Sequence, residues 1–235
     1  MLRSRILQLV VGLAMVGCTA NFGDPAEERR IELNCPPEDG ASEITSLRVV
    51  GAITIDGVLS EPSWDAARSI TFANLARSDN SIEVKVLWDD DSLYLGYSTV
   101  DPQIEAGDLN LIRNDGSQIF IDTDHDPIPD LDELDEDDVR IVVDIEGGIQ
   151  GPIVPNATQI IATGYVTEFS IPWAELGGLK PPETVMGILL ANNDRDDGTG
   201  IQFDWLDLIE TGPYARPYLW GDIHLSATLA DGDCP

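Results

Sequence analysis

The chain has 235 residues, and its 13 Lys and Arg face 43 Asp and Glu, which gives a formal net charge of −30 at pH 7. Such a field repels the phosphates of nucleic acids and anionic lipid surfaces and attracts cations, so the composition excludes nucleic-acid binding. Hydrophobic residues make up 43% of the chain, enough for the core of one large all-β domain.

The first 17 residues are predicted to be a signal peptide. Two arginines precede an apolar run over residues 6–16, which is too short to span a membrane. The run ends in Met-Val-Gly-Cys, which resembles a bacterial lipobox, and the resemblance implies that Cys18 carries the lipid. Thr19 follows instead of Asp, which indicates an outer-membrane lipoprotein of a diderm bacterium that contacts the membrane only through its lipid anchor. Ordinary cleavage near Ala20 is the alternative.

Residues 18–45 are predicted to be a polar tether, and residues 46–235 the folded domain. The tether has many polar residues and prolines and no sustained apolar period. It contains Cys35, and the remaining cysteine is Cys234. If Cys18 carries lipid, the other two are expected to pair as a disulfide in the oxidising compartment to which the chain is exported. We expect a monomer.

Short strands with a two-residue apolar period recur along the domain. A strand near Leu47 leads to a turn at Asp56-Gly57 and then to a helical turn capped by Ser60, which carries Trp64 into the core. Further strands and one more helical turn are predicted in these ranges: 82–88, 93–100, 158–171 with a break at Gly164, the turn 172–176, 185–191, 203–206 and 220–225. This pattern predicts an all-β fold, an antiparallel β-sandwich of the jelly-roll or immunoglobulin-like kind with one or two short helical turns.

The most distinctive stretch, residues 115–145, is predicted to be a hairpin with a long acidic loop. Counting from Asp122, carboxylates stand at positions 1, 3, 5, 9 and 12, which is the ligand spacing of an EF-hand calcium loop. These predicted Ca²⁺ ligands are Asp122, Asp124, Asp126, Asp130 and Glu133. Pro127 replaces the glycine that an EF-hand needs at position 6, and the stretch instead resembles the calcium repeats of thrombospondin type 3 modules. A merely solvated loop is the alternative. The acidic turn at residues 192–198 is likewise expected to be either a solvated turn or a second calcium site.

Several pieces in this order resemble a family 9 carbohydrate-binding module. They are Ile55 to Trp64, Val84 to Asp89, Leu93 to Leu95, Asp101-Pro102, Asp115 to Asp122, Phe169 to Trp173, Asn192 to Asp194, and Trp220-Gly221. The resemblance implies a non-catalytic domain that holds structural calcium and grips a polysaccharide or oligosaccharide between two aromatic rings.

The resemblance also implies three sugar-binding residues. Gln118 stands where the family has a sugar-binding carboxylate, Arg140 near a family arginine, and Tyr214 near the second aromatic ring, where we expect it to be exposed. The first ring would lie just before Asp115, but residues 111–114 contain no aromatic side chain. Other rings that could offer stacking surface are Trp205, Tyr218 and Trp220, of which the two tryptophans match core positions.

Three other functions remain open. The missing ring is also compatible with a calcium-stiffened structural module that binds no sugar. A haem domain of the same superfamily would have to use ligands from a short set: Met186, His125, His224, Lys85 and Lys180. An enzyme is not expected, because no hydrolase, zinc-protease or phosphate-loop motif occurs, and the chain is predicted to be non-catalytic.

Overall fold

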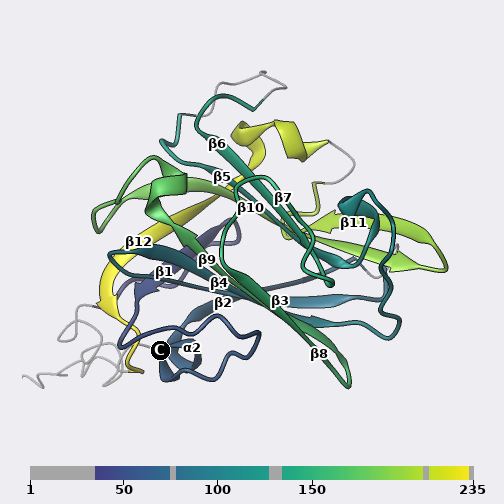
Figure 1. Cartoon of the computed structure of the whole chain (residues 1–235). Coiled ribbons are helices and arrows are strands. Elements are labelled where there is room, and N and C mark those ends of the chain that lie inside the picture. The colour runs from purple at the N-terminus through teal and green to yellow at the C-terminus, as the bar shows by residue number, and fades with distance from the viewer. Residues whose placement is uncertain (1–34, 75–77, 127–133, 209–211, 233–235) are drawn as a thin grey trace, which may run out of the picture.

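The computed structural model describes residues 35–74, 78–126, 134–208 and 212–232, and these residues form one 12-stranded, hydrogen-bonded sheet (Figure 1). The strands are β1 Glu43–Arg48, β2 Arg68–Ala73, β3 Ser81–Trp88, β4 Ser92–Val100, β5 Gly116–Asp122, β6 Asp138–Asp144, β7 Ile149–Gln150, β8 Asn156–Ile161, β9 Gly164–Pro172, β10 Val185–Asp196, β11 Thr199–Asp204 and β12 Gly221–Leu229. The helical turns are α2 Pro62–Ala66, η1 Leu111–Arg113, η2 Trp173–Leu176, η4 Pro213–Ala215 and η5 Pro217–Leu219.

The strand order is β7-β6-β5-β10-β12-β1-β3-β4-β9-β8, with β11 added to β10 and β2 to β3. The sheet folds over so that β3, β4 and β9 face β5, β6 and β10, and β12 with β1 joins the two layers (Figure 1). Every pairing is antiparallel except those of β1, which runs parallel to both β12 and β3. The predicted β-sandwich is confirmed.

The main core lies between the two layers and follows the two-residue period of the strands. Val84 and Val86 of β3 face inward, as do Ile119 and Ile121 of β5, and all four are fully buried. A hydrogen bond of 3.0 Å from the Tyr97 hydroxyl to the Gln118 carbonyl oxygen crosses the core. The layers are therefore held together by apolar packing with a buried polar contact between them.

The folded domain begins earlier than predicted, because β1 starts at Glu43, inside the stretch assigned to the tether. Its four central residues are buried, since Ile44 packs in the main core while Leu47 packs in a smaller one with Trp64. Arg68 also ties down the preceding segment, donating to the carbonyl oxygens of Pro36 and Pro37. Strand β1 is only six residues long. So short a pattern does not indicate from sequence alone that the polar residues around it belong to the folded domain.

The two predicted helical turns, α2 and η2, are present with one difference at a cap, whereas η1, η4 and η5 were not predicted. Helix α2 begins after Glu61 rather than Ser60, and Trp64 within it is fully buried as expected. Turn η2 ends at Gly177, whose φ of 77° is the left-handed conformation that glycine adopts without strain. Within the described residues, no helix is long and apolar enough to cross a membrane.

The cysteine predictions fall largely outside the described residues. Cys35 is disulfide-bonded, while Cys18 and Cys234 lie outside the described ranges. The pairing of Cys35 with Cys234 therefore stays a prediction, as does the lipid on Cys18.

Candidate functional site

A small aromatic cluster covers the outer face of β5 and β10, opposite the main core. Phe120 points outward between the inward-facing Ile119 and Ile121, and it packs with Leu189 of β10 and with Trp220. The Tyr214 ring, from turn η4, stacks on Phe120 with ring centroids 5.4 Å apart and an interplanar angle of 23°. This face therefore carries aromatic surface beside the polar groups of the neighbouring strands.

Arg140 joins this aromatic cluster to a row of amide side chains. It lies opposite Phe120 in the β5–β6 register, and its guanidinium carbon is 5.3 Å from the Phe120 ring centroid. Its Nη2 donates to Gln118 Oε1 at 2.9 Å, and Gln118 Nε2 donates to Asn193 Oδ1 at 2.6 Å. Burial lowers the pKa of Arg140, yet a guanidinium stays charged in proteins. The result is a fixed cation beside an aromatic pair.

The structure brings together the three predicted sugar-binding residues. Gln118 and Arg140 are hydrogen-bonded, and Tyr214 and Arg140 both contact the Phe120 ring. Tyr214 is half-buried rather than exposed, because its ring packs against Phe120, and Gln118 is fully buried. Both Arg140 Nε and Asn193 Nδ2 lack a hydrogen-bond partner in the described part of the chain.

Sequence reasoning did not single out Phe120 or Asn193 as part of this face. Strand periodicity contains the signal for both of them: Phe120 is two residues after Gln118, and Asn193 is two residues after Ala191, which pairs with Gln118. Trp220 is buried in the aromatic cluster, and Trp205 packs partly against both this cluster and the main core. The stretch where the first ring was sought forms turn η1, which contains no aromatic side chain.

Part of the predicted calcium loop converges, together with one carboxylate that was not predicted to take part. Carboxylate oxygens of Asp122, Asp124 and Asp126 lie within 4.8 Å of one another and of Asp137, which was not among the predicted ligands. The other two predicted ligands, Asp130 and Glu133, lie outside the described residues. A hydrogen bond with Asp124, together with burial and neighbouring charge, raises the pKa of Asp137 to about 7. Crowded carboxylates of this kind are relieved either by protons or by a cation.

A second carboxylate cluster is buried where the two layers meet. Asp101 follows β4, Asp115 precedes β5 and Asp194 lies in β10, and their oxygens are within 4.8 Å of one another. The three residues are at most 3% exposed. Burial raises the pKa of Asp101 to about 6 and that of Asp115 to about 7.

The oxygens of this buried cluster are only partly satisfied. Asp115 accepts hydrogen bonds from the backbone nitrogens of Glu105 and Arg195. One oxygen of Asp101 and both oxygens of Asp194 have no hydrogen bond of good geometry within the described residues. Burial raises the pKa of Asp194, although Ser78 and the backbone nitrogen of Asp79 lie close enough to offset part of that rise. Three adjacent buried carboxylates, two of which have oxygens without a well-formed hydrogen bond within the described residues, suit a hard divalent cation such as Ca²⁺ only if their oxygens face one another. Here the ligand oxygens of all three lie within 4.8 Å of one another.

Two of the residues considered for haem, Met186 and Lys85, have other contacts in the fold. Met186 is fully buried in the main core, and Lys85 Nζ donates to the carbonyl oxygen of Trp64 at 2.8 Å. The two histidines meet at a separate place on β12, away from Met186's face of the sheet.

Comparison with known proteins points to one family. The family model described as "Carbohydrate family 9 binding domain-like" matches residues 55–228. Among curated proteins, the exoglucanase XynX of Acetivibrio thermocellus is 28% identical over 168 residues, which cover 68% of this chain and 15% of that protein. The endo-1,4-beta-xylanase A of Thermoanaerobacterium saccharolyticum is 26% identical over 168 residues. The chain thus spans only about a seventh of these relatives, 15% and 14% of their lengths.

Solved structures show the same fold. A family 9 carbohydrate-binding module from Caldicellulosiruptor kristjanssonii, solved in complex with cellotriose, superposes with a TM-score of 0.67 at 22% identity. The match covers 79% of this chain and 94% of that module. The same kind of module in complex with glucose matches equally well, with a TM-score of 0.67.

Proposed function

The chain belongs to the carbohydrate family 9 binding domain-like family, and from that membership we propose that it is a non-catalytic module that binds an oligosaccharide or polysaccharide. The binding face is the outer surface of β5, β6 and β10. The observation that carries the proposal is the placement of the Arg140 guanidinium, bonded to Gln118, against the same ring on which Tyr214 stacks.

This combination suits a sugar because a pyranose has an apolar face and a rim of hydroxyl groups. An aromatic ring covers the apolar face, while charged and amide groups read the hydroxyls through directional hydrogen bonds. Arg140 is fixed by the buried Gln118, so little side-chain entropy is lost when it binds. Relatives named as glucanase and xylanase, and neighbours holding cellotriose and glucose, favour β-linked glucose or xylose units as the ligand.

The test is a titration of the protein with cellotriose and xylotriose by calorimetry. Tyr214→Ala removes the stacking ring and is expected to weaken binding about tenfold or more, a loss of roughly 1.4 kcal/mol or more. Tyr218→Ala is the matched control, since Tyr218 is a half-buried tyrosine in the neighbouring turn η5. Equal losses in the two variants would contradict the proposed face, and so would binding that survives Arg140→Leu unchanged.

We propose that calcium stabilises the domain, with Asp101, Asp115 and Asp194 as the principal ligands. The burial of all three side chains and, within the described residues, the oxygens of Asp101 and Asp194 without a well-formed hydrogen bond support this assignment. The loop carboxylates Asp122 and Asp124, with their neighbours, form a more exposed candidate site. In both places a bound Ca²⁺ would neutralise charges that otherwise repel one another.

A calcium-stiffened module without sugar binding is the second candidate. It is favoured by the lack of an aromatic ring in turn η1 and by the full burial of Gln118. A melting temperature that rises with Ca²⁺ but with no oligosaccharide or polysaccharide would support this candidate.

We propose that the module is displayed on the outer membrane through a lipid on Cys18. The lipobox-like stretch before Cys18 and the presence of Thr19 after it, where Asp would favour the inner membrane, support this location. Cys18→Ala is expected to move the protein from the membrane fraction of a diderm host to the soluble fraction. Membrane association that persists in this variant would contradict the anchor.

A further inference from the structure

The only two histidines of the chain meet at one carboxylate on β12. His224 and Asp222 both belong to β12, and His125 follows β5 in sequence. The Nε2 atom of His125 lies 3.0 Å from Asp222 Oδ1. Two rare residues from distant parts of the chain therefore converge on one spot.

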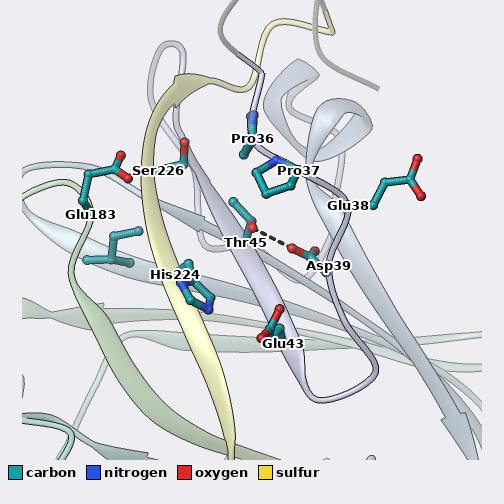
Figure 2. Close-up of a pocket in the computed structure, with 10 residues that line it drawn as sticks. Pro36, Pro37, Glu38, Asp39, Glu43, Thr45, Glu183, His224 and Ser226 are labelled. Atoms are coloured by element: carbon teal, nitrogen blue, oxygen red, sulfur yellow. Dashed lines mark hydrogen bonds between the residues drawn. The ribbon is translucent and has the colours of Figure 1, made fainter. Parts of the chain in front are cut away.

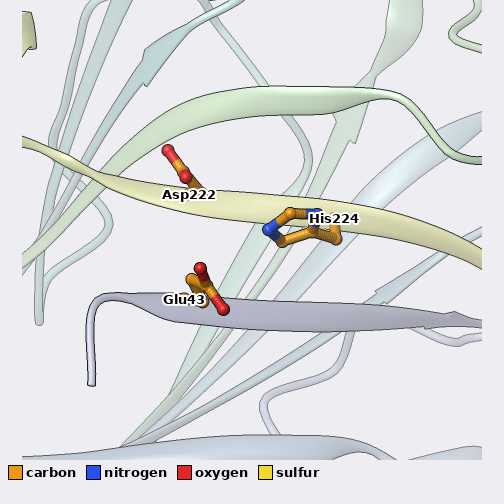
Figure 3. Close-up of side chains that lie close together, drawn as sticks. All are labelled: Glu43, Asp222 and His224. Carbon is orange, nitrogen blue, oxygen red and sulfur yellow. The ribbon is translucent and has the colours of Figure 1, made fainter. Parts of the chain in front are cut away.

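Strand register completes this cluster with Glu43. In the parallel pairing of β1 with β12, Glu43 lies beside Asp222 and Thr45 beside His224, so all four side chains share one face. Ligand atoms of Glu43, Asp222 and His224 lie within 4.8 Å of one another. Figure 3 shows the three side chains close together, with Asp222 and His224 on β12 and Glu43 on the neighbouring strand β1.

His224 points to a missing ligand at this place. Its Nε2 atom is buried and has no hydrogen-bond partner within the described residues. The neighbouring Thr45 hydroxyl donates to Asp39 Oδ1 at 2.6 Å instead (Figure 2). A buried ring nitrogen next to two carboxylates is costly unless it receives a proton or binds a metal.

Space for further ligands lies beside the cluster. A cavity of about 230 Å³ is lined by Glu43, Thr45 and His224 together with the segment before β1 (Figure 2). Glu183 also lines it and adds a further carboxylate. Water or a small anion in this cavity could complete the coordination of a metal held by three side chains.

The ligand types distinguish this cluster from the acidic calcium candidates. Ca²⁺ takes oxygen ligands, whereas an imidazole nitrogen beside carboxylates suits Zn²⁺ and related transition-metal ions. We propose that Glu43, Asp222 and His224 bind a Zn²⁺ ion, with a water from the cavity as the fourth ligand. His125 is a positioning residue, because its ring nitrogen lies in hydrogen-bonding contact with Asp222 and orients that carboxylate.

The test is a calorimetric titration of the metal-stripped full chain with Zn²⁺ in excess Ca²⁺, which occupies the oxygen-only sites. One Zn²⁺ per chain is expected. His125→Gln should weaken zinc binding by about 10- to 100-fold, as for loss of an outer partner, and His224→Gln, which removes a ligand, should weaken it more. Asp137→Asn is the control: it removes a carboxylate from the acidic loop and should leave zinc binding unchanged.

A second variant keeps the test decisive if His224→Gln disturbs β12. Glu43 is exposed at the first position of β1, so Glu43→Gln should fold normally and still weaken zinc binding. Replacing Zn²⁺ by Co²⁺ should produce a visible absorption band of low coordination number that His224→Gln abolishes. Unchanged affinity in both variants, loss of binding in Asp137→Asn, or displacement of Zn²⁺ by Ca²⁺ would overturn the proposal.

Discussion

Glu168 illustrates how a single buried charge organises the loop between β1 and α2. One carboxylate oxygen accepts hydrogen bonds from the backbone nitrogens of Asp56, Gly57 and Val58, at 2.9, 2.7 and 3.2 Å. The other accepts from Trp64 Nε1 at 3.1 Å. Glu168 itself is fully buried on β9, so these four donors are what compensates for its loss of water.

Glu168→Gln is therefore expected to destabilise the fold by about 2–3 kcal/mol, because it weakens charge-assisted hydrogen bonds and can turn an amide group toward backbone donors. The measurement is the free energy of unfolding from urea titrations. Glu175→Gln is the matched control: Glu175 is exposed in turn η2, so its loss should change stability by at most about 0.5 kcal/mol. Similar values for the two variants would contradict the role given to Glu168.

The residues of the proposed sugar-binding face were partly predictable from sequence. Gln118 and Arg140 come from the two strands of one hairpin, so a local motif suffices to bring them together. Asp101, Asp115 and Asp194 stand near the ends of three strands in two layers, and a contact of this kind depends on how the layers fold over. The same holds for Glu43 and His224, which lie 181 positions apart (224 minus 43) and meet only through the parallel pairing of β1 with β12.

At the scale of elements, the β10–β11 hairpin shows how turn chemistry sets a register. Asp196 pairs with Thr199, so the loop consists of Asp197 and Gly198 alone. Both have positive φ, 49° and 76°, as a type I′ turn requires. The acidic stretch read from sequence as a turn over 192–198 is thus mostly strand, and only its last two residues turn.

Gly198→Ala is expected to cost about 1 kcal/mol, because an L-residue is strained at this φ. Apart from its chain neighbours, no atom of the described residues lies within 4 Å of the position of the added Cβ, so this cost is conformational and not steric. Gly164→Ala is the contrast, since its Cβ would lie 2.0 Å from the Thr99 carbonyl oxygen and the loss should be clearly larger. The measurement is the free energy of unfolding of both variants from urea titrations. A larger loss in Gly198→Ala than in Gly164→Ala would contradict this reasoning.

Strands and hairpins were the predictable part of the fold because each has its own period and turn signals. Hairpin β5–β6 appears with Ile119 opposite Ile141, as its alternating apolar residues indicate. The start of β1 was missed because this short strand lies between β12 and β3 and takes its stability from both. Long-range pairing of this kind leaves little local pattern in the sequence.

For the whole molecule, the dominant physical feature is a net charge of −30 carried on a fold that concentrates carboxylates in several places. The described residues contain four groups of three or four metal-ligating side chains, two of which share Asp194. Self-repulsion opposes the compact state at such a charge. Divalent cations relieve it where carboxylates are closest, so stability should depend jointly on pH and on calcium.

The pH dependence follows from the buried cluster. Burial raises the pKa of Asp101 to about 6 and of Asp115 to about 7, above the value near 4 of an unfolded chain. Without metal, the folded protein binds more protons than the unfolded chain between about pH 4 and 7, and its stability falls as pH rises through that range. Bound Ca²⁺ requires ionised carboxylates, so the stabilisation it adds grows as pH rises.

Thermal melts should therefore show a lower melting temperature in EDTA at about pH 7.5 than at about pH 5, and a gain of several degrees on adding Ca²⁺ that is larger at the higher pH. Asp101→Asn tests whether the buried cluster causes this pH dependence. It replaces a carboxylate that has an unpartnered oxygen within the described residues by a neutral amide that can donate to Asp194. This variant should melt higher than the parent in EDTA at the higher pH and lose most of the calcium response. Asp124→Asn, in the exposed loop, should retain the pH slope. A metal-free melting temperature that does not change with pH would mean that the buried carboxylates are not the groups that couple stability to calcium.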